Sequence, residues 1–139
     1  MPAPAFVDTN ILVYADDRRD PAKQSRAQDL IRQLIREKTG RLSTQVLAEY
    51  FVAATRKLGI DAVDARRRVE LYSRFDVVTL QPADILGAID LHRLHGFSLW
   101  DALIVRAALL AGCRTLYSED LQSGFRIEAL EILNPFPGP

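Results

Sequence analysis

Three acidic residues lie inside apolar stretches of the sequence, where an ionised side chain is hard to accommodate. Asp8 lies within AFVDTNILV, Glu49 within VLAEYFV and Asp101 within FSLWDALIV. Burying an unpaired carboxylate costs several kcal/mol or forces it to take up a proton. None of the three stretches contains a Lys, Arg or His, so each charge needs a partner from elsewhere. One cation shared by all three carboxylates would meet that need.

A fourth acid, Asp120, follows the strand-like segment TLY after a short polar step, and its neighbour Glu119 is expected to face solvent. A cluster of carboxylates cannot stay fully ionised without a cation. Carboxylate ligands without His or thiol groups favour Mg²⁺ or Mn²⁺, which can polarise a phosphodiester and activate water for in-line attack. The sequence therefore predicts a Mg²⁺ (or Mn²⁺) cofactor, with catalytic and metal-binding roles for Asp8, Glu49, Asp101 and Asp120.

Each of the four acids has a simpler interpretation, which the sequence leaves open. Asp8 could form an Asx-turn with the following amides, and Glu49 could be an exposed helix residue without a role. Asp101 stands three residues after Ser98, which is the spacing of a capping box. Asp120 could be an exposed acid of a turn. A capping role for Asp101 is compatible with function, because such sites are often built at the start of a helix.

Three short polar residues beside the acids are predicted to orient the ligands or a water molecule. They are Thr9, Asn10 and Ser118. Polar groups of this kind commonly support metal ligands through hydrogen bonds. Ordinary turn and cap chemistry would explain them equally well.

The 139 residues, 48% apolar and 26% charged, fit one globular domain over residues 1–139. One cysteine, no leader-like N-terminus and no long apolar run favour a cytoplasmic protein without disulfides. The zero net charge hides an asymmetry, because residues 18–74 carry 14 Lys or Arg against 7 Asp or Glu. Arginine suits phosphate, so Arg66, Arg67 and Arg68 are predicted to contact RNA, with ion pairs along a helix face as the alternative.

Short apolar segments alternate with amphipathic ones from end to end. The hydrophobic spacing, caps and Gly or Pro punctuation predict strands at 5–7, 41–43, 77–80, 114–117 and 129–133. They predict helices at 10–15, 21–38, 44–58, from 61 or 64 to 75, and at 82–95 and 99–112, with a loop at 118–124 and a turn-rich ending at 134–139. This alternation favours an α/β fold with a mostly parallel sheet covered on both faces. Functional groups in such folds collect at the carboxyl ends of the strands.

Four sequence motifs in this order resemble the acidic motifs of the PIN-domain nucleases. They are VDTNIL, STQVLAE, SLWDALI and LYSEDLQSG, and the NPF near the end is similar to a frequent ending of that family. The match extends over essentially the whole chain. Within the family, a domain of this size is most similar to the VapC-type toxins of type II toxin–antitoxin systems.

The resemblance implies a three-layer α/β/α fold with a central parallel sheet of about five strands. It implies endonucleolytic cleavage of RNA with Mg²⁺ or Mn²⁺, with Asp8 and Asp101 as the main ligands and Glu49 and Asp120 completing the pocket. It also implies a cognate antitoxin that blocks or distorts the site, and a homodimer. One departure is Glu119, because two adjacent acids leave the fourth ligand ambiguous by one position.

Two other functions remain open at this point. A non-catalytic PIN-like module could bind RNA or protein with the same fold. An aspartyl-phosphate phosphotransfer protein also places a carboxylate after its first strand. The dehalogenase type, however, needs a second Asp where Asn10 stands, and the receiver type needs a late Lys, whereas no Lys follows Lys57.

Overall fold

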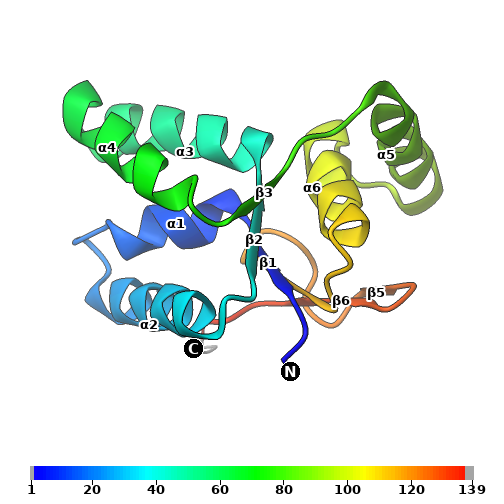
Figure 1. The fold of residues 1–139 in the computed structure, drawn as a ribbon, viewed down its shortest axis with the longest axis horizontal. Coiled ribbons are helices and arrows are strands. Elements are labelled where there is room, and N and C mark those ends of the chain that lie inside the picture. The colour runs from blue at the N-terminus through cyan, green and yellow to red at the C-terminus, as the bar shows by residue number, and fades with distance from the viewer. Residues whose placement is uncertain (1, 137–139) are drawn as a thin grey trace.

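The computed structural model describes residues 2–136, and in it a sheet is flanked by helices on both sides (Figure 1). In chain order the elements are β1 (Ala5–Val7), α1 (Thr9–Ala15), α2 (Pro21–Glu37), β2 (Gly40–Ser43), α3 (Thr44–Arg56), α4 (Ala62–Tyr72), β3 (Asp76–Val78), α5 (Pro82–His95), α6 (Leu99–Leu110), β4 (Thr115–Tyr117), β5 (Arg126–Ile127) and β6 (Leu130–Leu133). Each predicted helix and strand is present, with its ends shifted by at most a few residues. The predicted turn-rich ending at 134–139 lies partly outside the described residues.

The strands form one sheet in the order β3-β2-β1-β4-β6-β5. The first five strands in this order, which are β3, β2, β1, β4 and β6, run parallel and confirm the expected parallel sheet. The sixth, β5, runs antiparallel to β6. The sequence analysis did not predict β5. The two-residue turn between β5 and β6 begins with Glu128 at φ 54°, a conformation that normally favours Gly or Asn. Because neither Gly nor Asn stands at this position, the sequence lacks the usual signal of a hairpin.

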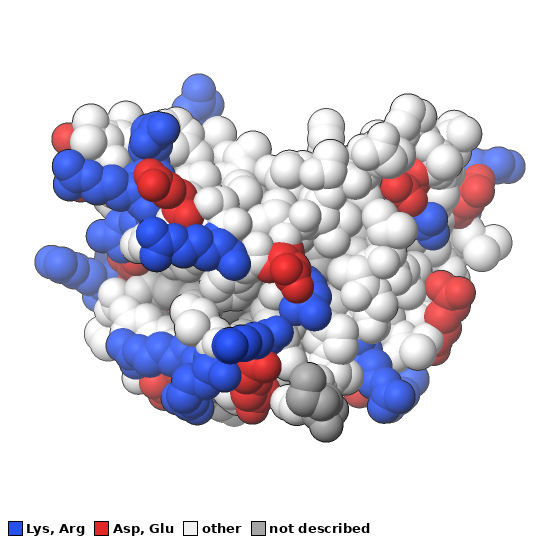
Figure 2. All heavy atoms as spheres, viewed as in Figure 1, with Lys and Arg blue, Asp and Glu red and all other residues white. Residues whose placement is uncertain are grey.

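The helices form the two outer layers of the predicted α/β/α arrangement. Helices α1 to α4 lie on one side of the sheet, where neighbouring helices pack in the spatial order α2, α1, α3, α4 (Figure 1). Helices α5 and α6 lie together on the other side. Lys and Arg side chains gather over the side that carries α2 and α4 (Figure 2). Across residues 2–136, every helix is too short or too polar to cross a lipid bilayer.

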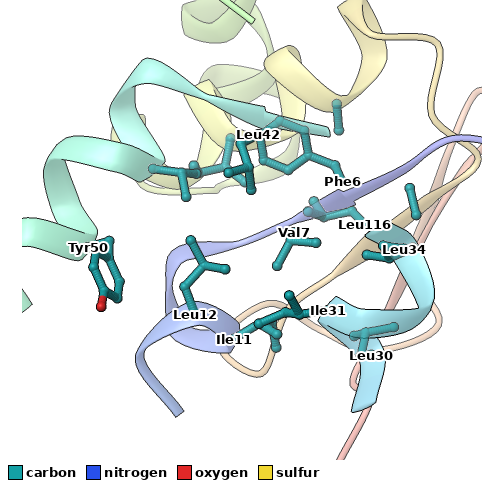
Figure 3. Close-up of a cluster of buried hydrophobic side chains, with 14 of the residues drawn as sticks. Phe6, Val7, Ile11, Leu12, Leu30, Ile31, Leu34, Leu42, Tyr50 and Leu116 are labelled. Carbon is teal, nitrogen blue, oxygen red and sulfur yellow. The ribbon is translucent and has the colours of Figure 1, made fainter. Parts of the chain in front are cut away.

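The core lies between the sheet and these helices, directly beneath the carboxyl ends of the strands. Phe6 and Val7 of β1 are fully buried, and Leu116 of the neighbouring β4 packs with them (Figure 3). Burial of each such side chain contributes about 1.5–3 kcal/mol. The strand that ends at Asp8 is therefore firmly held.

Caps at the strand ends set the positions of the functional side chains. Asp8 caps α1 directly after β1, and Ser43, the last residue of β2, caps α3. The Asp8 N–H donates to the Tyr117 carbonyl at the end of β4, with 3.0 Å between nitrogen and oxygen. Since β1, β2 and β4 are parallel neighbours, their carboxyl ends share one edge of the sheet.

Candidate metal centre

Asp8 is the most buried of the four predicted ligands, with 5% of its surface exposed. Its Oδ1 accepts the Thr9 N–H at 2.7 Å, and its Oδ2 accepts the Ser118 hydroxyl at 2.8 Å and the Asn10 amide at 3.3 Å. Burial raises the pKa of Asp8 to about 6, the hydrogen bonds oppose the rise, and the charges of Glu49 and Asp101 add to it. Asp8 is thus a carboxylate whose negative charge is poorly compensated by the protein.

Glu49 approaches Asp8 from the second turn of α3. Its Oε1 accepts the Thr9 hydroxyl at 2.7 Å, and its Oε2 accepts the Gln45 amide at 3.1 Å. The side chain is half-buried, so it is not a free residue on a solvent-facing helix surface. Thr9 links the two acids, because its N–H binds Asp8 while its hydroxyl binds Glu49.

Asp101 enters the cluster from the first turn of α6. Its N–H donates to the Ser98 hydroxyl at 3.1 Å, which is one half of the predicted capping box. Burial raises the pKa of Asp101, and the charges of Asp120 and Glu49 raise it further. Asp101 therefore lies within electrostatic range of acids on α3 and on the loop after β4.

Asp120 and Glu119 point to different surroundings, although they are adjacent in the chain. The Asn10 amide donates to Asp120 Oδ2 at 3.1 Å and also binds Asp8, so Asp120 belongs to the acid cluster. The Glu119 carboxylate instead accepts the Tyr14 hydroxyl at 2.7 Å and forms an ion pair with Lys23. The expectation that Glu119 faces solvent is therefore wrong, because only 23% of its side chain is exposed.

The three predicted supporting residues connect these acids. The fully buried Ser118 donates to Asp8, and its oxygen accepts the backbone N–H groups of Asp120 and Leu121. Asn10 uses its amide for Asp8 and Asp120, and its Oδ1 accepts the Glu119 N–H at 3.1 Å. The same hydrogen bonds therefore shape the turns and support the acids, so the two interpretations of these residues both hold.

The sequence analysis did not identify Gln45, which also belongs to this site. Its amide donates to Glu49 Oε2 at 3.1 Å and to the carbonyl of Trp100 at 3.2 Å. Gln45 and Glu49 are four residues apart on α3, and this spacing places side chains together on one helix face. The spacing could have identified Gln45 as a neighbour of Glu49, whereas nothing in the sequence indicated its contact with α6.

The donor set of the cluster fits a hard divalent cation. Its members are carboxylates with hydroxyl and amide neighbours, and neither His nor Cys contributes a contact. Within residues 2–136, however, no three acidic, His or Cys side chains meet closely enough to form a ready-made metal site. Thr9, Asn10 and Ser118 connect the acids through hydrogen bonds, and burial raises the pKa values of Asp8 and Asp101, with a smaller contribution from the neighbouring acids.

The predicted RNA-binding arginines lie on α4, where each pairs with an acid. Arg66 pairs with Glu70 and Arg67 with Asp64 along the exposed helix face, at 3.6 Å and 3.5 Å. Arg68 instead pairs with Asp16, which also accepts the hydroxyl of the buried Tyr50. Arg66 and Arg67 therefore show the ion pairs that were the alternative interpretation, and Arg68 ties α4 to the end of α1.

Similarity to known proteins identifies the family that shares this fold. The family model of the PIN domain matches residues 5–126. A search of curated proteins found no significant match. Among solved structures, the chain is similar to VapC20 of Mycobacterium tuberculosis, a sarcin-ricin loop cleaving toxin, with a TM-score of 0.66 and 20% identity over 84% of this chain and 91% of that one.

Two further solved structures have the same fold. A toxin–antitoxin complex from Klebsiella pneumoniae matches with a TM-score of 0.70 and 21% identity over 95% of this chain and 98% of that one. VapBC2 of Rickettsia felis, bound to a DNA fragment from its promoter, matches with a TM-score of 0.66 and 19% identity over 92% and 96%. The family match spans most of the sequence, and Asp8, Glu49, Asp101 and Asp120 lie within electrostatic or hydrogen-bonding range of one another's groups at the carboxyl edge of the sheet. The chain belongs to the PIN-domain family.

Proposed function

We propose that this protein is a Mg²⁺- or Mn²⁺-dependent endoribonuclease and the toxin of a type II toxin–antitoxin pair. The observation that carries the proposal is the buried Asp8, whose carboxylate is coupled to Glu49 and Asp101 at the carboxyl edge of the sheet. Membership of the PIN family and the toxin–antitoxin proteins among its structural neighbours support it.

In the proposed mechanism, Asp8 and Asp101 hold the cation, with Glu49 and Asp120 completing the negative pocket. When bound, the cation supplies charge stabilisation for the phosphodiester and lowers the pKa of a water molecule. The Thr9 hydroxyl holds the Glu49 carboxylate and the Ser118 hydroxyl holds that of Asp8, while Asn10 holds the loop that carries Asp120. The contribution of these residues is to fix the ligands before substrate arrives.

The basic side of the molecule supports a polyanionic substrate. Lys and Arg side chains gather over α2 and α4 (Figure 2). Arg66 and Arg67 are 79% and 73% exposed, and exposed ion pairs contribute little, so both can exchange their acids for phosphates. We keep them as proposed contacts to the RNA backbone, whereas Arg68 is already engaged with Asp16.

An antitoxin is the proposed protein partner. A hollow of about 700 Å³ between α2 and α4 is lined by apolar residues, among them Leu34 and Phe75, and by the charged residues Lys38, Arg41, Arg68, Arg74 and Asp76. This chemistry suits a partner segment with apolar and acidic side chains. Co-expression with the small protein of the adjacent reading frame should yield a complex on size-exclusion chromatography, and separate elution would contradict the proposal. The homodimer stays a prediction, which light scattering tests.

The direct test of function is cleavage of RNA by the purified chain. RNA and single-stranded DNA of the same sequence are incubated with the protein and Mg²⁺ or Mn²⁺, and the fragments are separated on a denaturing gel. We expect internal cuts in RNA and none in DNA. Intact RNA under all conditions, together with RNA or protein binding, would instead support the non-catalytic module.

The Lys23–Glu119 ion pair provides a prediction about positioning. Lys23 on α2 holds Glu119, whose own N–H is bound by Asn10, so the pair anchors the loop that carries Asp120. Lys23→Met and Glu119→Gln should each lower kcat by about 10- to 100-fold, the usual effect of losing a residue that supports a metal ligand. KM should change little, because neither residue is proposed to touch RNA.

Lys57→Met is the matched control, since Lys57 is exposed at the end of α3. The Lys23→Met/Glu119→Gln double variant should be no worse than the more damaging single variant, because both changes break the same contact. Activity of Lys23→Met equal to that of wild type would show that the ion pair does not position the loop.

A further inference from the structure

Trp100 is the only tryptophan of the chain, and 64% of its surface is exposed. It lies in the first turn of α6, directly before Asp101. The other strongly exposed large hydrophobic residues within 2–136 are all aliphatic. A large aromatic ring beside a site is a candidate contact residue, because aromatic side chains bury a large area when they bind.

Trp100 forms one wall of a hollow of about 340 Å³. The other lining residues are Leu80, Ile85 and Leu103, which are apolar, and Ser43, Thr44 and Gln45, which are polar. These residues come from the end of β2 and the start of α3, from the segment before α5 and its first turn, and from α6. The lining carries no charged side chain, so it does not suit a phosphate.

The hollow and the acid cluster share a wall. The Gln45 amide donates to Glu49 Oε2 on one side and to the Trp100 carbonyl on the other, at 3.1 Å and 3.2 Å. Trp100 is also adjacent in sequence to Asp101. A nucleic-acid strand with a phosphate at the acids therefore brings a neighbouring nucleotide to the mouth of the hollow.

The chemistry of the lining matches an unpaired nucleobase. Bases released from a duplex stack on aromatic side chains and present hydrogen-bonding edges, and here Trp100 offers the ring while Thr44 and Gln45 offer polar groups. The hollow is near the lower limit of small-molecule sites in volume. A second protein chain would need roughly 1,000 Å² or more of buried surface, far more than this hollow provides.

We propose that an unpaired base of the RNA substrate binds in this hollow, stacked on Trp100 next to the acid cluster. The inference rests on the proposed ribonuclease function and assigns to Trp100 a contact with a base beside the cut. Duplex RNA, whose bases are paired and stacked on each other, cannot fill the hollow.

Fluorescence tests this directly, because Trp100 supplies all of the tryptophan emission. The Asp8→Asn variant, checked on a gel for intact RNA, is titrated with a single-stranded oligoribonucleotide and with its duplex. We expect saturable quenching by the single strand and little by the duplex. The absence of quenching by a single strand that binds in an anisotropy assay would overturn the proposal.

Two substitutions separate stacking from simple apolar contact. In the Asp8→Asn background, Trp100→Phe should keep affinity for the labelled single strand within a few-fold, whereas Trp100→Leu should weaken it by about 10- to 100-fold. Leu94→Ala, at a 78% exposed residue of α5 outside the hollow, is the matched control and should bind normally. Circular dichroism and thermal melting check that each variant is folded.

The outcomes distinguish this inference from the proposed function. If the wild-type protein cleaves RNA but Trp100→Leu binds as tightly as Trp100→Phe, the base site is wrong and the ribonuclease stands. If the wild-type protein cleaves no RNA, the ribonuclease proposal fails. Emission that shifts with protein concentration alone, with Trp100→Leu favouring monomer, would show that a second copy covers the hollow and would overturn the proposal.

Discussion

Replacing Asp8 by asparagine should lower the rate of RNA cleavage by at least about 10²–10³-fold while the fold is retained, which is the scale set by losing one preorganised electrostatic group. Asp8 is the buried acid on which Thr9, Ser118 and Asn10 converge. Asparagine keeps one acceptor for the Thr9 N–H but brings no negative charge to a cation. The rate is measured under single-turnover conditions with excess protein and saturating Mn²⁺.

The same substitution should stabilise the metal-free protein at neutral pH. Burial raises the pKa of Asp8 from 3.8 to about 6, so the folded state binds a proton at this site more tightly than the unfolded chain. The contribution of Asp8 to the free energy of unfolding is therefore greatest below pH 4 and falls as the pH rises from about 4 to 6. The introduced asparagine side chain does not titrate, so the variant should gain about 1–3 kcal/mol at pH 7 and lose that gain near pH 4.

Urea unfolding in EDTA at pH 4, 5, 6 and 7 measures this difference. Asp29→Asn is the matched control, because it removes the same charge from a side chain that is 64% exposed on α2. The control should show no comparable gain and should cleave RNA normally. Normal cleavage by Asp8→Asn would refute the assignment of Asp8 as a ligand.

Removal of divalent cations should abolish cleavage completely, and Mn²⁺ or Mg²⁺ should restore it. Binding of the cation should also be visible without RNA, because it stabilises the ionised forms of Asp8 and Asp101, whose pKa values are raised by burial and, to a lesser extent, by the neighbouring acids. At 100 times its dissociation constant a ligand stabilises a protein by about 2.7 kcal/mol. For a chain of this length that corresponds to a rise in Tm of roughly 10 °C.

Thermal melting and calorimetry in EDTA and in Mn²⁺ test this second prediction. Affinity should weaken as the pH falls below about 6, because protons compete for Asp8. Asp101→Asn should lose most of the Mn²⁺-induced rise, whereas Asp29→Asn should keep it. Identical melting curves with and without Mn²⁺, with RNA absent or present, would leave the acid cluster without a cation to bind.

Local sequence determined the elements other than β5, with boundaries correct to within a few residues. Asp20 before Pro21 and Ser98 are caps whose hydrogen bonds to the following amides form within one turn, so their type and position suffice to predict them. The apolar stretch around Asp8 likewise indicated a buried carboxylate at a strand end, and the structure places it there. Burial and capping are readable because both depend mainly on near neighbours in the chain.

Only the tertiary structure decided which side chains meet. Glu119 and Asp120 are equivalent in the sequence, and they differ because Lys23, 96 residues from Glu119, draws that acid away while Asn10 holds Asp120. The contact of Gln45 with the Trp100 carbonyl and the pairing of Arg68 with Asp16 also join distant segments. Such contacts follow from the order of strands in the sheet, which places the ends of β1, β2 and β4 side by side. Sequence spacing does not encode that order, because it results from the packing of the whole core.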